Sequence, residues 1–482
     1  MTADDITALD ASALSTLLHT RQLSCRELMS ATLARIHALN PRFNAIVNLA
    51  PDATLLAQAD ACDVELAQGR SRGWLHGIPQ AIKDAADTVG FPTTKGCTLL
   101  AHNMPARDGV MAQRMKGAGC IVIGKTNMPE LGLGSHTFNA LFGATRNAWD
   151  DAVSAGGSSG GAAVALAQRL LPVADGSDFM GSLRNPAGWN HMFGMRPTQG
   201  RVPLGPGPDV WVDQLVSEGP MARNVRDLGR LLATQSGHDA RLPLSLQSGL
   251  GWSHEEPVDP AATLRGLKVG WLGDLGGYLP MDAGVLDVCR DALGHMQAAG
   301  AVVEDVALGM DPSALWECWL TWRRALVGPR VDALIHLPGA RQAIKPEALW
   351  EYEGSQGLAF MDFMRASQQR TQYYQHMRGL LARWDVLALP SAQVWPFAIG
   401  ERWPQQIAGR TMDTYHRWME VTLYATLAGL PAISMPAGFH PNGRWPMGVQ
   451  LIAAHSADAK LLRVAAAYEA VREEFIALRP GE

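Results

Sequence analysis

The sequence has few cysteines and histidines for its 482 residues, and none of them stand at a spacing typical of a metal site. Its fourteen histidines include no His-Glu-x-x-His motif, which would place two zinc ligands on one face of a helix. No Cys-x-x-Cys pair occurs among the six cysteines, which are Cys25, Cys62, Cys97, Cys120, Cys289 and Cys318. We therefore expect free, buried thiols rather than a disulfide framework, and no bound metal.

Long apolar runs, basic clusters and a signal peptide are also missing. No stretch has the roughly 20 apolar residues that a helix needs to cross a bilayer, and no run of Lys or Arg would attract an anionic membrane. The net charge of −5 gives no electrostatic footprint for nucleic acid. The first residues, MTADDITALDASALSTLL, lack the basic and apolar regions of a signal peptide. We expect a cytoplasmic protein that binds neither nucleic acid nor a membrane.

A helix near the N-terminus has recognisable start and stop signals. Ser24 and Glu27 form a capping-box pattern, in which each side chain accepts a hydrogen bond from the other residue's backbone. Apolar residues then recur at helical spacing until Asn40-Pro41, where we expect the helix to end.

Farther along, short strand-like runs alternate with helical patterns. Residues 120–123 (CIVI) predict a strand that Gly124 would end. Residues 267–272 (LKVGWL) predict another strand, followed by a helix to about Ala299 and a strand at 301–303. This order predicts an α/β fold, with a large mixed β-sheet core flanked by helices on both faces.

A segment rich in glycine and serine, AGGSSGG at 155–161, precedes a strong helix former, AAVALA. One interpretation is a flexible turn, although its glycines also allow backbone conformations closed to other residues. A phosphate-binding loop would end in Gly-Lys-Ser/Thr, which is missing here. A Gly-x-Ser-x-Gly nucleophile elbow matches residues 156–160, but it needs a buried strand before it, and residues 149–154 (WDDAVS) do not resemble one.

Two further segments contain side chains suited to acyl transfer. In GSDFMGSLRNPA (176–187), Ser182 follows turn-forming residues whose N–H groups can converge into an oxyanion hole. In GIPQAIKD (77–84), Lys83 ends an apolar strand-like run. Such a lysine is most often solvated, but a lysine drawn into an apolar site loses proton affinity and can act as a base. Asp84 would point to the opposite face of the strand and need not pair with Lys83.

These segments belong to an ordered set of motifs that resembles the amidase-signature family over nearly the whole chain. The motifs are GIPQAIKD (77–84), GKTNMPEL (124–131), FGATRNAWD (142–150), GGSSGG (156–161), GSDFMGSLRNPA (176–187), MRPTQGRVP (195–203), GLPAISMP (429–436) and PMGVQLI (446–452). The resemblance implies one amidase-signature domain over 1–482. We expect an N-terminal helical segment at about 1–60, a catalytic core at about 61–250, a helical covering layer at about 310–425 and C-terminal core elements at about 426–482.

The resemblance also implies the catalytic residues. Ser182 is the nucleophile, Ser158 the proton bridge and Lys83 the base of a Ser-cisSer-Lys triad, with a cis peptide bond at Gly157–Ser158. Neutral Lys83 accepts the proton of Ser158, which accepts the proton of Ser182 as its oxygen attacks the carbonyl. An acyl-enzyme forms and water then hydrolyses it, so no metal or organic cofactor is required.

Residues next to the nucleophile have supporting roles in the same resemblance. The backbone N–H groups of Phe179, Met180 and Gly181 would hold the oxyanion. The expected supporting side chains are Ser159, Asp178 and Arg184.

Two departures from the family pattern bear on specificity. Phe179-Met180 stands where many members have Thr/Met-Gly, and the pattern resembles the branch of cyclic nylon-oligomer hydrolases and bacterial aryl and acyl amidases. Gln80 replaces an apolar residue usual before the lysine, and the sequence offers no physical account of it. We expect hydrolysis of small uncharged amides, linear or cyclic, including anilides and carbamates, with esterase or urethanase side activity.

Trp316, Trp319 and Trp322 recur every three residues on a predicted helix. They can pack the helical layer onto the core, or Trp316 and Trp319 can wall an apolar acyl or aryl pocket.

Two other functions compete with a free-standing amidase. One is that of the glutamine-hydrolysing component of a tRNA-dependent amidotransferase, which needs a partner and a pocket for a zwitterion. The other is a catalytically inactive binding scaffold, which the retention of all three catalytic side chains disfavours. The expected partner is a small-molecule amide, and the candidate assembly is a homodimer.

Overall fold

The computed structural model describes residues 1–481, and its centre is an eight-stranded mixed β-sheet. The strands of this sheet are β6 (Val173–Asp178), β7 (Phe193–Arg196), β8 (Ser217–Ala222), β9 (Lys268–Trp271), β10 (Val302–Asp305), β11 (Val386–Pro390), β14 (Ala432–Phe439) and β15 (Pro446–Ile452). Their order across the sheet is β10-β9-β11-β15-β14-β7-β8-β6. Strand β9 runs parallel to both of its neighbours, and the remaining pairs are antiparallel. The predicted mixed sheet is confirmed.

Helices occur along the whole chain. The first half contains α1 (Ala3–Ala8), α2 (Ala11–His19), α3 (Cys25–Phe43), α4 (Asp52–Ala67), α5 (Val110–Gly117), α6 (Gly160–Ala167), α7 (Arg184–Trp189) and α8 (Val225–Gln235). The second half contains α9 (Pro260–Leu264), α10 (Val285–Ala298), α11 (Pro312–Ile335), α12 (Ala340–Ala343), α13 (Pro346–Ser355), α14 (Phe360–Leu380), α15 (Leu423–Leu427), α16 (Asp458–Val471) and α17 (Glu473–Ile476). Short 3-10 helices are η1 (Thr98–Leu100), η2 (Glu130–Gly132) and η3 (Arg417–Thr422).

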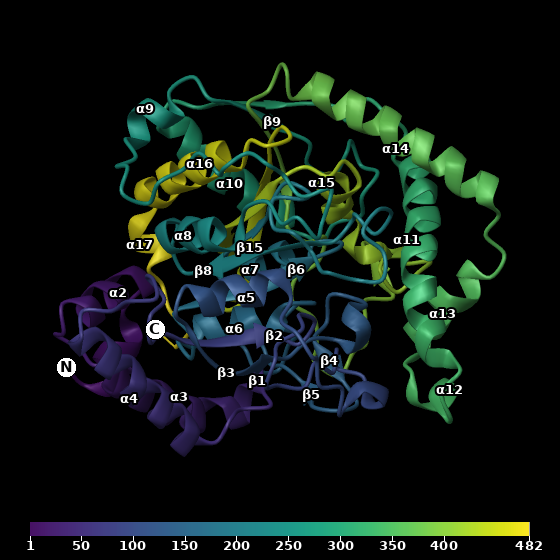
Figure 1. Ribbon diagram of the computed structural model, residues 1–482. Coiled ribbons are helices and arrows are strands. Elements are labelled where there is room, and N and C mark those ends of the chain that lie inside the picture. Colours follow the sequence, from purple (N-terminus) through teal and green to yellow (C-terminus); the bar gives the residue numbers. More distant parts are fainter. Residues whose placement is uncertain (482) are drawn as a thin grey trace.

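Helices cover both faces of the large sheet, as the sequence predicts. Helices α8, α10 and α16 pack against one another and against one face, while α6 and α7 pack on the other (Figure 1). Helix α8 illustrates the cause, because its apolar residues at helical spacing, Val225, Leu228, Leu231 and Leu232, are all buried. Helix α6 is buried along its whole length. Its small residues permit this, since a Cβ on Gly161 would lie 2.4 Å from the backbone nitrogen of Asn127.

A small three-stranded sheet lies beside the large one and carries the lysine singled out above. It has the order β1-β3-β2 and consists of β1 (Ile46–Val47), β2 (Pro79–Lys83) and β3 (Ile121–Thr126). The expectation that Gly124 ends its strand is wrong, because β3 continues through it. Glycine is accommodated there because β1 approaches closely, and a Cβ would meet the carbonyl oxygen of Val47 at 3.0 Å. The remaining strands form two hairpin-like pairs, β4 (Phe138–Asn139) with β5 (Gly143–Ala144) and β12 (Gln406–Ile407) with β13 (Arg410–Thr411).

Helix α3 begins as predicted but ends later. The Ser24–Glu27 capping box is present, with both reciprocal hydrogen bonds. Pro41 lies inside the last turn instead of ending the helix, and Asn44 closes it in a left-handed conformation. A proline removes one backbone donor, and the loss is small in a final turn that the Asn44 N–H caps by bonding to Asn40 O at 2.7 Å.

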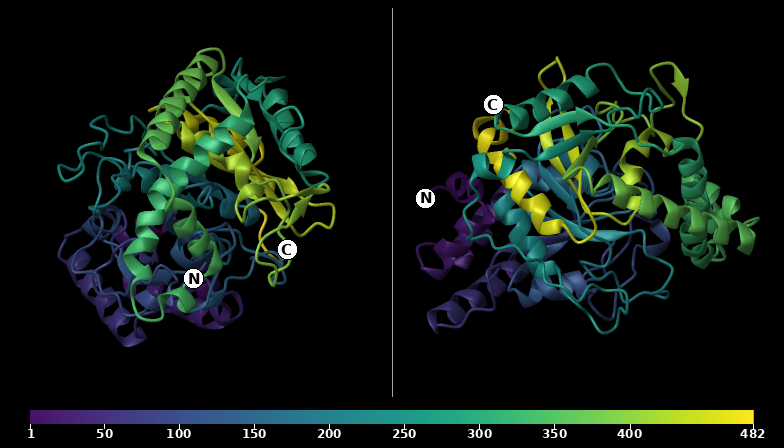
Figure 2. Two further views of the ribbon diagram at one scale, coloured as in Figure 1. Left: turned by 90° about the vertical axis from the view of Figure 1, so that its right-hand side faces the viewer. Right: turned by 90° about the horizontal axis from the view of Figure 1, so that it is seen from above.

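Helices α11 to α14 lie together on one side of the molecule in every view (Figure 2). The interval 310–425 is not helical throughout, however, because it also contains the central strand β11. A helical prediction from tryptophan-rich patterns cannot identify a five-residue strand buried on both faces. Within residues 1–481, no helix has both the length and the apolar character needed to span a membrane.

Candidate active site

Lys83 ends β2, and its ammonium group lies among three serines. Its Nζ donates to Ser158 Oγ at 2.8 Å, to Ser159 Oγ at 2.8 Å and to Ser177 Oγ at 3.0 Å. It also lies 3.2 Å from the carbonyl oxygen of Ser177. The side chain is buried, with 1% of its surface exposed. The two predicted residues Lys83 and Ser158 are therefore in direct contact.

Burial has a clear electrostatic consequence for Lys83. Desolvation lowers its pKa to about 7, although the negative charges of Asp175 and Asp178 oppose the shift. A large fraction of this lysine is therefore neutral near neutral pH and able to accept a proton. Asp84 does not pair with it, as predicted, because its carboxylate accepts hydrogen bonds from Thr94 and from the Gly96 N–H.

Two carboxyl groups near Lys83 escaped the sequence analysis. Asp175 accepts the backbone N–H of Lys83 at 3.1 Å, and burial raises the pKa of this carboxyl to about 6. Glu218 pairs with Ser177 across strands β6 and β8, and burial raises its pKa to about 8. Because side chains alternate along a strand, Asp175 and Ser177 share one face of β6, and this alternation is the signal that could have identified them.

Ser158 lies in a turn built from glycines. The Gly157–Ser158 peptide bond is cis, as the family resemblance implied. Gly156 has φ +76°, and a Cβ there would lie 2.6 Å from Asn185 Oδ1. The residues just before this turn make only isolated bridges, so no strand precedes it as a nucleophile elbow would require.

Ser182 lies between β6 and α7, with 4% of its surface exposed. The backbone N–H of Ser159 donates to its carbonyl oxygen at 3.3 Å, which ties the two serine-bearing loops together. The Ser182 hydroxyl makes no hydrogen bond to the residues that the structure describes, and the expected contact between the Ser158 and Ser182 hydroxyls is therefore not formed as a hydrogen bond.

The segment before Ser182 differs from expectation at one oxyanion donor. The Gly181 N–H donates to Asp178 Oδ1 at 2.8 Å and is already occupied. The N–H groups of Phe179 and Met180 donate to no protein acceptor within residues 1–481, which leaves them open to an oxyanion. Gly181 has φ +87°, and a Cβ there would lie 2.6 Å from the Thr422 side chain.

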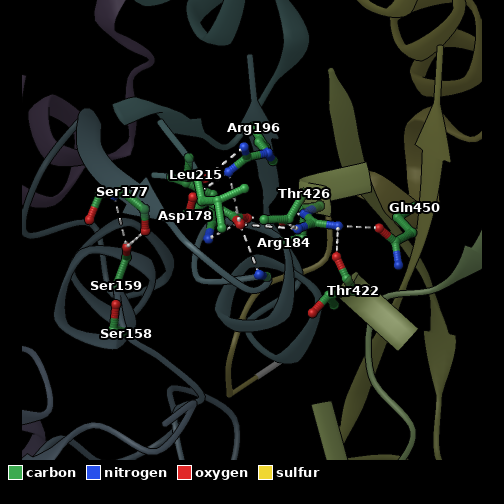
Figure 3. Close-up of polar contacts among 12 residues, drawn as sticks. Ser158, Ser159, Ser177, Asp178, Arg184, Arg196, Leu215, Thr422, Thr426 and Gln450 are labelled. Carbon is green, nitrogen blue, oxygen red and sulfur yellow. Dashed lines mark hydrogen bonds and ion pairs between the residues drawn. The ribbon is translucent and has the colours of Figure 1, made fainter. Parts of the chain in front are cut away.

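Asp178 and Arg184 form a buried network that supports the Ser182 loop (Figure 3). Both Asp178 oxygens accept from Arg184, at 3.0 Å each, and one also accepts the Leu183 N–H at 3.2 Å. Burial opposes the negative charge, but Arg184 and Arg196 outweigh it, so the pKa of Asp178 is lowered to about 2.

Arg184 extends this network to distant elements. Its guanidinium donates to the Thr422 carbonyl at 2.9 Å, to Gln450 Oε1 at 2.6 Å and to Thr426 Oγ1 at 3.1 Å. These contacts connect α7 with η3, α15 and β15, as Figure 3 shows. The loop of Ser182 is thus fixed from several sides by one cation.

An aromatic wall stands over the Ser182 loop. The rings of Phe179 and Trp319 have centroids 5.0 Å apart. Arg323 lies 5.3 Å from the Phe179 centroid and forms a buried ion pair with Glu351. The Tyr415 hydroxyl donates to Glu351 Oε1 at 2.6 Å. The wall therefore contains one cation and one carboxylate, whose charges cancel.

The other predicted tryptophan lies farther along the same helix. Trp316 packs against His416, with ring centroids 5.1 Å apart, and Trp322 packs against Phe363 of α14. Trp319 alone of the three contacts Phe179, so packing and wall-forming roles are divided along α11.

Gln80 receives a physical account from the structure. Its Nε2 donates to the carbonyl oxygens of Pro79 at 3.0 Å and Val173 at 2.9 Å. The contact with Val173 joins β2 to β6, the strands that carry Lys83 and lead to Ser182. Within residues 1–481, no group of three or more His, Cys, Asp or Glu side chains could hold a metal ion.

Comparison with known proteins gives matches along most of the chain. The family profile described as Amidase matches residues 27–462. An acylamidase of Rhodococcus erythropolis is 32% identical over 98% of this chain and 97% of that protein. The first of the glutamyl-tRNA(Gln) amidotransferase subunits, from Ralstonia nicotianae, is 33% identical over 96% of this chain and 98% of that protein.

Solved structures give the same picture. A bacterial aryl acylamidase of the amidase signature family superposes with a TM-score of 0.89 and 28% identity, over 98% of this chain and 99% of that chain. The 6-aminohexanoate cyclic dimer hydrolase in complex with substrate superposes with a TM-score of 0.85 and 28% identity, over the same shares of the two chains.

Proposed function

The chain belongs to the amidase signature family, and on that premise we propose that it is a free-standing serine amidase for small uncharged amides. The observation that carries this proposal is the contact of a buried lysine of lowered pKa with a serine hydroxyl, Lys83 Nζ to Ser158 Oγ at 2.8 Å. A neutral amine at this distance is the base that a serine nucleophile needs.

The proposed reaction begins with proton transfer through Ser158. As Ser182 Oγ attacks the substrate carbonyl carbon, its proton passes to Ser158, whose own proton passes to Lys83. The hydroxyls of Ser182 and Ser158 must rotate into contact for this step, and such hydrogen bonds commonly tighten only when substrate is bound.

Collapse of the tetrahedral intermediate breaks the C–N bond. The proton held by Lys83 returns through Ser158 to the leaving nitrogen, so the amine departs neutral and the acyl group stays on Ser182. Water then attacks the acyl-enzyme with the same base and releases the carboxylic acid. The free N–H groups of Phe179 and Met180 are the proposed donors to the oxyanion in both halves of the reaction.

The aromatic wall supports an uncharged, aryl or acyl substrate. Phe179 and Trp319 offer apolar ring faces next to the nucleophile. The charge of Arg323 is matched by Glu351, so this wall has no net charge with which to select a zwitterion. Similarity to an acylamidase and to an aryl acylamidase supports the same substrate class.

A second candidate is glutamine hydrolysis within a tRNA-dependent amidotransferase. The 33% identity to a component of a glutamyl-tRNA(Gln) amidotransferase favours it. An assay of the purified chain alone against anilides, aliphatic amides, cyclic amides, carbamates, aryl esters and glutamine separates the two. We expect turnover of anilides or apolar amides. Ammonia release from glutamine alone, with every apolar amide inert, would overturn the proposal in favour of the amidotransferase.

A further inference from the structure

A cavity of about 420 Å³ lies beside α14 and the C-terminal end of α15, and none of Lys83, Ser158 or Ser182 lines it. Its polar lining includes Gln199, Gln214, Arg370, Tyr374 and His455, and Trp322 forms part of its apolar wall. Ligand-binding cavities commonly measure about 300–1,000 Å³. The cavity is thus large enough for a small organic molecule.

The unusual feature of this cavity is the positive charge of Arg370. The guanidinium donates from Nε to the Leu427 carbonyl at 2.8 Å and from Nη2 to Gln199 Oε1 at 3.0 Å. It lies 4.7 Å above the ring of Trp322. Both hydrogen-bond partners are neutral, and Nη1 makes no hydrogen bond to residues 1–481.

No carboxylate within the described part of the chain forms an ion pair with Arg370. Burial lowers the pKa of Arg370 to about 10, so it remains charged at neutral pH. Proteins pair buried charges with a counter-charge, because an isolated one is costly. Arg184 and Arg323, the buried arginines described above, follow this rule with Asp178 and Glu351. Arg370 is the departure from it.

We propose that this cavity binds the carboxylate of a small organic acid, with the free edge of the Arg370 guanidinium as its principal donor. The ligand supplies the counter-charge that the protein omits. The Tyr374 hydroxyl and His455 Nε2, which have no hydrogen-bond partners among residues 1–481, add neutral donors to the same cavity.

The charge of the cavity selects a carboxylate over a phosphate. Arg370 is the single cation among the cavity residues, and one positive charge matches one negative charge. Burial lowers the pKa of His455, which keeps this imidazole neutral at neutral pH. A phosphate dianion would be left with an unmatched charge.

The apolar wall indicates the rest of the ligand. Leu244, Leu246, Trp322 and Leu427 line the cavity and provide contact for an alkyl or aryl body. An organic acid such as benzoate or butanoate therefore fits the lining better than a small inorganic anion.

The site meets the Ser182 loop at α15. Arg370 binds the carbonyl of Leu427, and Arg184 binds the hydroxyl of the preceding residue, Thr426. The binding site does not depend on the proposed amidase activity, and it is tested by binding alone.

Isothermal titration calorimetry on the full chain tests the proposal with benzoate, butanoate, inorganic phosphate and the uncharged benzamide. Benzoate is expected to bind best, and Arg370→Met to weaken it about tenfold to a hundredfold, the scale of a charged hydrogen bond. Arg378→Met changes an exposed arginine of the same helix and is expected to leave the affinity unchanged. Ser182→Ala is expected to retain the binding, which separates this site from the proposed catalytic serine.

The alternatives give opposite results. Equal binding of benzamide, tighter binding of phosphate, or unchanged benzoate affinity in Arg370→Met would each overturn the proposal. If Arg370→Met fails to fold, as judged by circular dichroism, Tyr374→Phe replaces it. This variant removes only one hydroxyl and is expected to weaken benzoate several-fold, and unchanged affinity in it counts against the site.

Discussion

The backbone N–H of Ser159 donates to the carbonyl oxygen of Ser182 at 3.3 Å, so the loop of the proposed proton bridge is bonded directly to the loop of the proposed nucleophile. Ser159 also accepts from Lys83 Nζ at 2.8 Å through its hydroxyl. One residue thereby holds the base and the nucleophile in a common frame.

Ser182→Ala is expected to abolish turnover of every amide substrate, because no other hydroxyl in the proposed mechanism forms the acyl-enzyme. Mass spectrometry after treatment with a fluorophosphonate is expected to find the adduct on the peptide that contains Ser182. An adduct on Ser159, or full activity of the alanine variant, would contradict the assignment.

The rate is expected to rise with pH through an ionisation near 7. Lys83 acts as a base only when neutral, and burial lowers its pKa to about 7, so activity is lost as pH falls below that value. Lys83→Ala is expected to cost about 10²-fold or more in kcat/KM and to flatten the profile. The control Lys460→Ala, at an exposed ion pair with Asp385, leaves the profile unchanged. An unaltered profile in Lys83→Ala would make this lysine structural.

Asp175→Asn is expected to move the acid limb of this profile to lower pH. Asp175 is the largest of the charges that favour the ammonium form of Lys83, and its own pKa of about 6 leaves it ionised above pH 7. Asparagine retains an acceptor for the Lys83 N–H and removes only the charge. Glu218→Gln is the comparison, with a smaller expected shift, because a pKa of about 8 leaves Glu218 largely protonated near pH 7. A shift to higher pH in Asp175→Asn would refute this account.

Asp178→Asn is expected to destabilise the fold in a pH-dependent manner. The pKa of Asp178 falls from its ordinary value of 3.8 to about 2 on folding, so its carboxylate adds about 2 kcal/mol to the free energy of unfolding above pH 4. That contribution disappears as pH falls through 2. Urea unfolding at several pH values measures it, with the exposed Asp305→Asn as control. Equal stability of Asp178→Asn and the parent at pH 7 would contradict the role of the network.

Phe179→Ala is expected to reduce the preference for aryl over alkyl amides by about tenfold, the scale of a lost aromatic contact. The ring of Phe179 contacts Trp319 beside the nucleophile, whereas its backbone N–H survives in alanine. The ratio of kcat/KM values for an anilide and an aliphatic amide gives the preference. Phe360→Ala, which changes an exposed phenylalanine, is the matched control. An unchanged ratio would remove Phe179 from the specificity wall.

Several features were predictable because they depend on neighbours in the sequence. The capping box of Ser24 and Glu27 uses residues three apart, and helix α10 and strand β9 follow from local apolar spacing. The motifs around Lys83, Ser158 and Ser182 identified the family through residue types in fixed local order. Local rules fail where tertiary contacts override them, as at Gly124 and Pro41, which continue elements that they were expected to end.

The amino-acid sequence by itself determined the family and the three residues proposed for catalysis, since both follow from ordered local motifs. Only the tertiary structure decided the environment of these residues. Asp175 reaches the Lys83 N–H across 92 positions, and the same kind of long-range contact places Trp319 on Phe179. Such contacts depend on which strands and helices become neighbours. The free energy of packing over the whole chain sets that arrangement, and short sequence patterns do not encode it.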